Sequence, residues 1–457
     1  MNFDPTIHAE RRARVFEELE RRGGGVLLLP SAGEKLRNST NEYPFRQDSD
    51  FHYLTGLDEP DSCALLSARP GERKFLLFVR PRDKAKEIWN GRRVGVEGAR
   101  AVHGADLAFT MGDLDSELAR WLDGAATLWF QLGADPAWDQ RVIGKISALR
   151  GEGRSGKRPP AAVASPGTVL HEQRLVKRPD ELALLRKAAD LTAEGHFSAM
   201  RDGQAGRREH QVQAEIEYAF RRRGAAGPGY GTIVAAGANS TILHYRAGDA
   251  ELRDGEVCLV DAGGEYGLYT ADVTRTFPVS GSFSGAQRDL YQACLDAQKR
   301  AIEAVKPGAT IDGIHALTVR ALTEGLVALG LLPGPVEDRI AEGDRLVKLP
   351  PGSPEERTAP QGYRKYYMHR TSHWLGMDVH DVGDYVVNGA SRPLQPGMVL
   401  TVEPGLYVAE DDETAPRALR GVGIRIEDDI LVTESGHENL TAAVPKEIAE
   451  IEAACVR

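Results

Sequence analysis

Residues 261–277, DAGGEYGLYTADVTRTF, place two acids on either side of a glycine-rich turn in a segment otherwise typical of a buried hairpin. A hairpin centred on Tyr266 and Gly267 brings Asp261 directly opposite Asp272. Opposed side chains of antiparallel strands lie about 4.5–5.5 Å apart at Cβ, and like charges in that position are destabilising. The pair therefore requires a cation, a shared proton or an arginine, unless the hairpin lies in solvent.

The nearest arginine in the sequence does not meet this requirement. Arg275 lies an odd number of residues from Asp272, so alternation along a strand predicts that its side chain points to the opposite face. A metal ion explains the acid pair better, and a solvated surface hairpin stays open as the alternative.

A weak internal repeat places a third acid in an equivalent position. Residues 252–264, LRDGEVCLVDAGG, align with residues 394–406, LQPGMVLTVEPGL, so that Asp261 falls on Glu403. Each copy reads as a turn, a buried strand and a carboxylate at the strand end. The pattern predicts two similar halves that face a shared centre, although chance similarity of two strand-turn segments is the alternative.

Two further segments supply groups that a metal site needs. Residues 368–385, MHRTSHWLGMDVHDVGDY, contain three of the 12 histidines, and neutral imidazole is the usual nitrogen ligand. In GVGIRIEDDILVT, Glu427 shares a strand face with Arg425, while Ile424 and Ile426 point to the other side.

These segments together predict an oxygen-rich dinuclear site. Four carboxylates balance two divalent cations, and such a set suits Mn²⁺ better than a structural zinc ion. Two metal ions would polarise a carbonyl and produce hydroxide near neutral pH. The predicted ligands are Asp261, Asp272, His373, Glu403 and Glu427.

Two other motifs are absent from the sequence. His369 and His373 lie four residues apart, but no glutamate follows His369, so the H-E-x-x-H motif of zinc peptidases is not present. The glycine-rich residues 224–237, GAAGPGYGTIVAAG, lack the G-K-[ST] ending of a phosphate-binding loop.

The chain divides into two regions of different pattern. Residues 1–172 alternate helix-like stretches with short apolar runs, which favours an α/β domain. After a proline-rich connection, a long amphipathic helix with Pro179 in its first turn opens a second domain, residues 173–457. We therefore predict an α+β protein of two domains.

Composition excludes several classes of protein. The net charge is −10 and no extended basic face is evident, so we expect no nucleic-acid partner. No apolar run approaches the roughly 20 residues needed to span a membrane, and the amino-terminal segment does not resemble a signal peptide. The four cysteines are scattered, which favours free thiols in a reducing compartment. We expect a cytoplasmic protein without a membrane partner.

The ordered motifs resemble the aminopeptidase P and prolidase family of metallopeptidases, which has the pita-bread fold and is related to methionine aminopeptidase and creatinase. The resemblance covers nearly the whole chain, from YPFRQDSDFHYLTG through TIVAAGANSTILHY and DAGGEYGLYTADVTRTF to HRTSHWLGMDVHDVG, TVEPGLY and GIRIEDD. It implies that the five residues chosen above bind two metal ions, usually manganese, with Asp272 and Glu427 bridging them.

The resemblance also implies a mechanism and roles for further residues. A metal-bridging hydroxide attacks the scissile carbonyl, and Glu403 accepts and returns the proton. His244 and His380 match histidines that approach the substrate, with His380 stabilising the oxyanion. The matched substrate-binding positions are His369, Tyr385, Tyr407 and Arg425, and Arg425 is also able to hold a ligand carboxylate in place. Core packing is the alternative for the two tyrosines.

The motifs are more similar to bacterial aminopeptidase P, which removes the residue before proline from peptides, than to prolidase, which cleaves Xaa-Pro dipeptides only. Prolidase remains the alternative, and a non-catalytic pita-bread binding module is a remote one. We further expect a homo-oligomer, a dimer or a tetramer. Residues 350–365 look like an insertion before the histidine motif.

Overall fold

The chain forms two compact units, residues 1–173 and 174–457, and the predicted hairpin of residues 261–277 belongs to the second. The computed structural model describes residues 4–246 and 248–456. The division lies within helix α7, one residue from the predicted domain boundary. Within the described residues, no helix is both long and apolar enough to cross a membrane.

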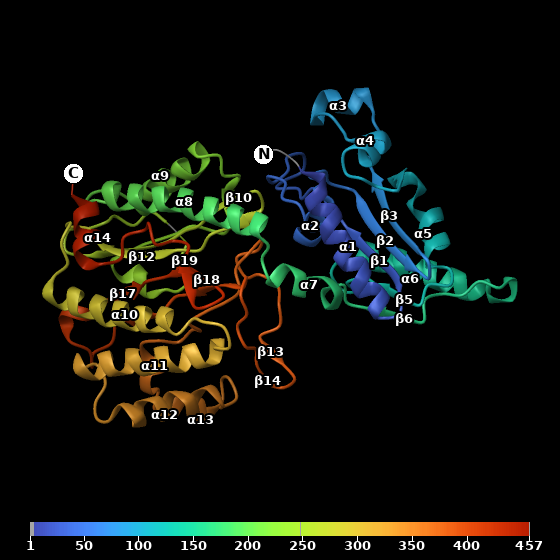
Figure 1. The fold of residues 1–457 in the computed structure, drawn as a ribbon. Helices are drawn as coiled ribbons and strands as arrows, with labels where there is room; N and C mark the ends of the chain where they lie inside the picture. Colours follow the sequence, from blue (N-terminus) through green and yellow to red (C-terminus); the bar gives the residue numbers. More distant parts are fainter. Residues whose placement is uncertain (1–3, 247, 457) are drawn as a thin grey trace. The chain divides into compact units, whose positions relative to one another are not determined.

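The first unit is a six-stranded mixed sheet with helices around it (Figure 1). Four of the short apolar runs form strands of this sheet, which confirms the α/β pattern. GVLLLP forms β1, CALLSA forms β2, KFLLFV forms β3 and ATLWFQLG supplies β5. The sheet has the order β4-β3-β2-β1-β5-β6, and β2 pairs antiparallel with both of its neighbours. Its strands are β1 Gly25–Pro30, β2 Cys63–Arg69, β3 Glu72–Val79, β4 Leu107–Thr110, β5 Thr127–Trp129 and β6 Ala162–Ala164.

Its helices follow the same alternation. Asp4, Asp48 and Asp135 cap helices by accepting backbone N–H groups, as helix starts prefer. The helices are α1 Pro5–Arg21, α2 Ser49–Thr55, α3 Lys84–Asn90, α4 Gly95–Ala101, η1 Met111–Asp113, α5 Leu114–Leu122, α6 Pro136–Gly151, η2 Gly153–Ser155 and α7 Gly167–Leu175.

The second unit begins with the helix that the sequence predicts. Helix α8 starts at Pro179 and has Asp180 and Glu181 in its first turn, where acids favour the positive end of the helix dipole. The helices are α8 Pro179–Asp202, α9 Glu209–Arg222, η3 Gly237–Thr241, α10 Gly285–Glu303, α11 Ile311–Ala328, α12 Val336–Val347, α13 Pro354–Thr358, η4 Gly362–Lys365, η5 Arg417–Leu419 and α14 Ile448–Cys455. The segment interpreted as an insertion forms α13 and η4.

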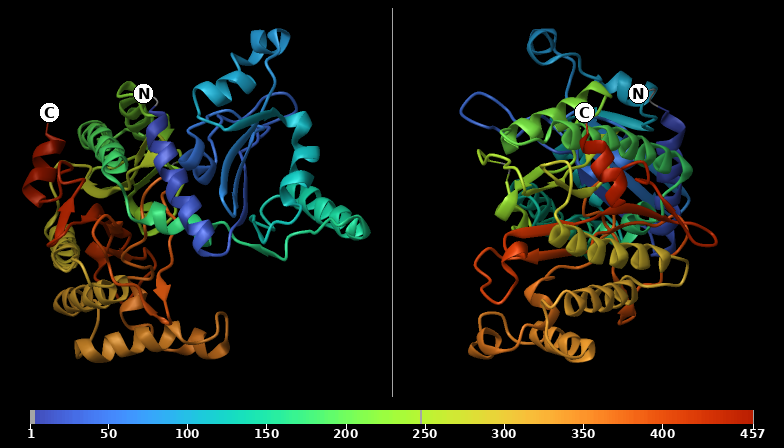
Figure 2. Two further views of the ribbon diagram at one scale, coloured as in Figure 1. Left: turned by 45° about the vertical axis from the view of Figure 1, so that its right-hand side comes forward. Right: turned by 90° about the vertical axis from the view of Figure 1, so that its left-hand side faces the viewer.

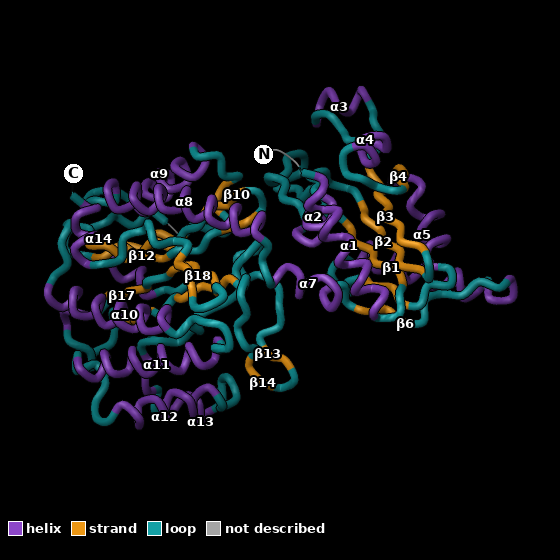
Figure 3. The backbone as a smooth tube through the Cα atoms, in the orientation of Figure 1, coloured by secondary structure: helices purple, strands orange, loops and turns teal. Residues whose placement is uncertain are grey.

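Short antiparallel sheets occupy the middle of this unit, with α8 and α9 on one side and α10 on the other (Figures 1 and 2). Figure 3 shows the same strands gathered within the surrounding helices. They pair in the orders β12-β9-β8, β11-β10-β7, β15-β18-β19, β16-β17 and β13-β14. The strands are β7 Gly227–Pro228, β8 Ile233–Ala236, β9 Val257–Asp261, β10 Gly264–Tyr266, β11 Tyr269–Thr270, β12 Thr274–Pro278, β13 Val386–Val387, β14 Ala390–Ser391, β15 Val399–Val402, β16 Gly405–Val408, β17 Val422–Arg425, β18 Asp428–Val432 and β19 His437–Asn439.

The internal repeat is confirmed as two equivalent strands. Gly255 before β9 and Gly397 before β15 both have positive φ, 83° and 90°, a backbone conformation that glycine adopts without steric cost. Both strands are buried along their whole length, and each ends at or next to an acid, Asp261 or Glu403. Each copy of the repeat therefore consists of a glycine turn and a buried strand, and places a carboxylate at the end of that strand.

The prediction that Asp261 pairs directly with Asp272 is wrong, because the turn lies one residue further along the chain than predicted. Gly267 and Leu268 form the turn with φ of 61° and 64°, the type I′ geometry that a two-residue hairpin favours. Asp261 therefore lies opposite Thr274. Asp272 lies between β11 and β12, outside the ladder, so the two acids are diagonal neighbours and not direct partners.

Candidate metal centre

Each predicted metal ligand lies at a strand end or in a loop beside one. Asp261 ends β9, Asp272 precedes β12, Glu403 follows β15 and Glu427 joins β17 to β18. His373 lies in a loop that runs beside β15, where its backbone carbonyl accepts the N–H of Thr401 at 3.0 Å. Since β9, β12, β15 and β18 are buried, their ends bring these charged side chains into the interior of the unit.

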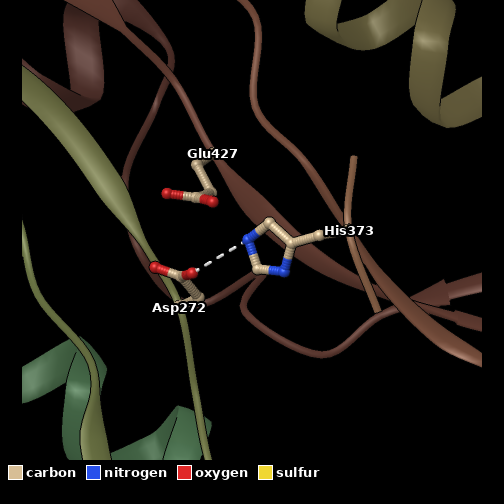
Figure 4. Close-up of side chains that lie close together, drawn as sticks. All are labelled: Asp272, His373 and Glu427. Atoms are coloured by element: carbon tan, nitrogen blue, oxygen red, sulfur yellow. Dashed lines mark ion pairs between the residues drawn. The ribbon is translucent and has the colours of Figure 1, made fainter. Parts of the chain in front are cut away.

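Three of the five side chains form a tight group. One ligand atom from each of Asp272, His373 and Glu427 lies within 4.8 Å of the others. Figure 4 shows the two carboxylates on one side of the imidazole, whose Nε2 lies 3.3 Å from Oδ2 of Asp272. Glu403 extends the group, because its Oε1 lies 3.5 Å from the same nitrogen.

Asp261 joins the group through a tyrosine that the sequence analysis did not select. The hydroxyl of Tyr230 lies 2.7 Å from Oδ1 of Asp261 and also contacts Oδ1 of Asp272. One phenolic proton bridges two carboxylates in this arrangement. All five predicted ligands and Tyr230 line a single cavity of about 1180 Å³.

The donor set fits divalent cations. Nδ1 of His373 donates to the backbone carbonyl of Trp374 at 3.0 Å, which leaves Nε2 directed at the acids. Burial, followed by the charge of Asp272, raises the pKa of Glu427 well above its usual range. Burial also raises the pKa of Asp272, and it raises that of Glu403 to about 7.

The histidine responds in the opposite direction. Burial alone would lower the pKa of His373, but the interaction with Asp272 and the charge of Glu403 raise it to about 9. Carboxylates that resist ionisation beside an imidazole that retains its proton indicate a shortage of positive charge. Metal ions would supply that charge.

Arg425 contacts one predicted ligand and supports a second, in the position that the family resemblance implied. Its Nη2 donates to Oδ2 of Asp261 at 2.7 Å, its Nε donates to Thr274 at 3.0 Å, and its Nη1 donates to the hydroxyl of Tyr407 at 3.1 Å. Thr274 in turn donates to Oε2 of Glu427 at 2.6 Å. The guanidinium, which is buried, thus orients one ligand directly and a second through Thr274.

The other predicted site residues surround this group. The ring of His380 lies 4.4 Å from that of His373, centroid to centroid and nearly perpendicular. His369 contacts the hydroxyl of Tyr407 through Nε2 at 2.9 Å, and burial, together with Arg425, lowers its pKa to about 3. His244 is exposed and lines the same cavity.

The two tyrosines differ in exposure. Tyr407 is buried, whereas Tyr385 is 40% exposed and lines the cavity. The ring of Tyr385 stacks on Trp374 at 5.3 Å, and its hydroxyl accepts the backbone N–H of Trp374 at 2.9 Å. Tyr407 is therefore a packed residue that contacts His369 and Arg425, and Tyr385 is the one that faces the cavity.

Besides Tyr230, the sequence analysis missed Thr274 and Asp429. The carboxylate of Asp429 is buried, and its Oδ2 accepts the backbone N–H of Asp272 at 3.1 Å. Alternation within RIEDD could have found it, because Glu427 and Asp429 share a strand face. No comparable signal marked Tyr230, which lies in a glycine-rich loop far from the acids in sequence.

Comparison with known proteins agrees with this architecture and places it in a family. The model of metallopeptidase family M24 matches residues 183–434, and that of the aminopeptidase P N-terminal domain matches residues 8–129. The Xaa-Pro aminopeptidase of Escherichia coli is 41% identical over 447 residues, 98% of this chain and 96% of that protein. Xaa-Pro aminopeptidase 3 of Homo sapiens is 34% identical over 459 residues, 98% of this chain and 85% of that protein.

Solved structures give the same result. Aminopeptidase PepP of Pseudomonas aeruginosa superposes with a TM-score of 0.92 at 42% identity, covering 99% of this chain and 98% of that one. Zn-substituted E. coli aminopeptidase P in complex with product superposes with a TM-score of 0.91 at 40% identity, covering 100% and 99%. The fold and site thus define an M24 metallopeptidase with the pita-bread catalytic domain. Within that family, the chain belongs to the aminopeptidase P group.

Proposed function

We propose that this metallopeptidase releases the first residue from peptides that carry proline in the second position. The observation that carries the proposal is the group of four carboxylates and one imidazole in an open cavity, with too little positive charge of its own. Two divalent cations, when bound, supply Lewis acidity toward a scissile carbonyl and a water molecule. The residues that would hold these ions are Asp261, Asp272, His373, Glu403 and Glu427.

Glu403 is the carboxylate best suited to move a proton. Asp261 is engaged by Arg425 and Tyr230, and Glu427 by Thr274. The side chain of Glu403 is 17% exposed, against 13% for Asp261 and 7% for Asp272, so Glu403 is the most accessible of the three. Its contact with Thr401 at 3.4 Å is weak. This carboxylate can accept a proton from the attacking water and return it to the leaving nitrogen.

Histidines flank the site on the substrate side. His380 packs against His373 and would donate a hydrogen bond to the oxyanion that develops on the scissile carbonyl. His244 lies exposed in the cavity wall, where it would contact the peptide. His369 and Tyr385 form the wall that we assign to the proline ring, since both line the cavity.

Proline specificity follows from the imide nitrogen, which carries no hydrogen. A site built for Xaa-Pro needs no acceptor there and can pack an apolar wall against the ring. We expect kcat/KM for Ala-Pro-Ala to exceed that for Ala-Ala-Ala by at least about 10²-fold, a difference of roughly 2.7 kcal/mol. Equal rates would contradict the proline assignment, and cleavage of Ala-Pro but not Ala-Pro-Ala would make the enzyme a prolidase.

We propose manganese as the native metal because the ligands are rich in oxygen. Reconstitution of metal-free protein with Mn²⁺ or Zn²⁺, followed by metal analysis and the same peptide assay, tests this choice. Higher kcat/KM with Zn²⁺ would contradict it.

We also propose a cytoplasmic homo-oligomer, dimeric or tetrameric, that binds neither nucleic acid nor membrane. All four cysteines are free and buried, which supports a reducing compartment. Two apolar side chains on α3, Ile88 and Trp89, are 81% and 86% exposed, which supports an interface between copies. Light scattering of purified protein measures the mass, and a monomer would contradict the oligomer.

A further inference from the structure

A small hairpin borders the cavity beyond Tyr385. Val386 on β13 and Ser391 on β14 are cross-strand partners, and both line the cavity. The turn between them, Asn388-Gly389, has φ of 53° and 78°, the type I′ geometry that suits a two-residue hairpin. Figures 1 and 3 show this hairpin at the end of a loop of the second unit.

The base of the hairpin is anchored at two places. Tyr385 stacks on Trp374, the residue that follows the predicted ligand His373. Arg392 donates its backbone N–H to the carbonyl of Tyr385 at 2.9 Å, and Pro393 bridges to Thr310 at the start of α11. These contacts fix the position of Val386 relative to the metal centre.

Val386 and Ile311 are two apolar residues of the cavity wall. Both line the cavity, and Val386 is 57% exposed while Ile311 is buried. Val387, the next residue, is 38% exposed, but alternation turns it to the other face of the hairpin. It is absent from the cavity lining that the described residues form.

We infer that Val386 and Ile311 form the apolar wall of a subsite for the side chain that follows proline in the substrate. This inference rests on the proposed function, in which Tyr385 contacts the proline ring. Tyr385 and Val386 both line the cavity, so a peptide that leaves the metal centre past Tyr385 meets Val386 with its third residue. An apolar third side chain would bury the apolar surface of Val386 and Ile311 away from water, which is favourable, and a polar side chain would not.

The test compares two tripeptides that differ only in the third residue, Ala-Pro-Leu and Ala-Pro-Ser. We expect the unaltered enzyme to favour Ala-Pro-Leu. Val386→Thr keeps the β-branched shape but replaces a methyl with a hydroxyl, and should lower the kcat/KM ratio of the two peptides roughly fourfold, the value of about one buried methylene. Val387→Thr is the matched control and should leave the ratio unchanged.

Three outcomes would overturn the inference. They are an equal loss on both peptides in Val386→Thr, an equal change of the ratio in Val387→Thr, and an effect of Val386→Thr on first-residue preference, measured with Leu-Pro-Ser against Ala-Pro-Ser. If the unaltered enzyme cleaves no peptide of the set, the proposed function itself fails. Cleavage without third-residue selectivity removes only the subsite.

Discussion

Two neighbouring buried acids at the start of β18, Glu427 and Asp428, have opposite electrostatic surroundings. Asp428 accepts from Arg275 and Lys446 at 2.6 Å each and from Gln298 at 2.8 Å. The side chain of Glu427 has one hydrogen bond, from Thr274, and faces other acids. Asp428 has an arginine and a lysine as partners, whereas no lysine or arginine of the described residues pairs with the carboxylate of Glu427.

The pKa values follow this difference. Burial alone would raise the pKa of Asp428, but Arg275 and Lys446 hold it well below the usual range. Burial and Asp272 raise the pKa of Glu427. A buried acid with cationic partners holds the fold together, while a buried acid without them is a place where a metal ion can bind.

The largest effect on activity should come from removing the charge of a predicted metal ligand. We expect Asp272→Asn or Glu427→Gln to lower kcat/KM for Ala-Pro-Ala by at least about 10³-fold, because each would remove a carboxylate that we assign to metal binding. Metal content should fall in parallel, while circular dichroism shows a folded chain. Full activity in either variant would contradict the two-metal assignment.

Removing the charge of Asp428 should lower the stability of the fold instead. Asp428→Asn leaves the buried Arg275 and the partly buried Lys446 near a neutral amide, and breaking a buried pair typically costs about 3–5 kcal/mol. Denaturant unfolding of the metal-free protein measures the free energy of unfolding. A variant as stable as the unaltered protein would show that the Arg275 network does not stabilise the fold.

The same acid predicts a pH dependence. Because the folded pKa of Asp428 lies below its unfolded value of about 3.9, its stabilising contribution is complete above that pH and is lost as pH falls through the folded pKa. Asp428→Asn should therefore lose less stability than the unaltered protein between about pH 4 and pH 2. An identical pH slope in the two proteins would contradict this account.

A variant of His380 tests the proposed catalytic role of the site without removing a predicted metal ligand. We expect His380→Ala to lower kcat by about 10²–10³-fold with little change in KM, as loss of an oxyanion partner does. Metal content should stay unchanged, since His380 is not a proposed ligand. An effect confined to KM would reassign this residue to substrate binding.

The smallest effect separates the two acids most directly. In metal-free protein, Glu427→Gln removes an acid whose ionised form its neighbours disfavour, so the free energy of unfolding should rise by about 1 kcal/mol. Asp428→Asn should show the opposite sign under the same conditions. Thermal unfolding in chelator measures both, and a loss of stability in Glu427→Gln would mean that the group has enough positive charge without metal.

Much of this site was readable from the sequence because its groups lie at strand ends and their faces follow a period of two. Alternation alone predicted that Arg275 points away from Asp272, and the contact with Asp428 confirms it. The repeat correctly predicted equivalent positions for Asp261 and Glu403. The family resemblance was equally local, since it depended on short ordered motifs.

The tertiary structure decided what those local patterns could not. The hairpin register depends on which two residues adopt positive φ, and Gly267-Leu268 displaced the predicted turn by one residue. Tyr230 reaches two of the acids from a loop more than 30 residues away in sequence, 31 from Asp261 and 42 from Asp272. The sequence by itself determined which groups are charged and which face of a strand they take. Only long-range packing decided which charges meet a protein cation and which are left for a metal, because that depends on elements distant in the chain.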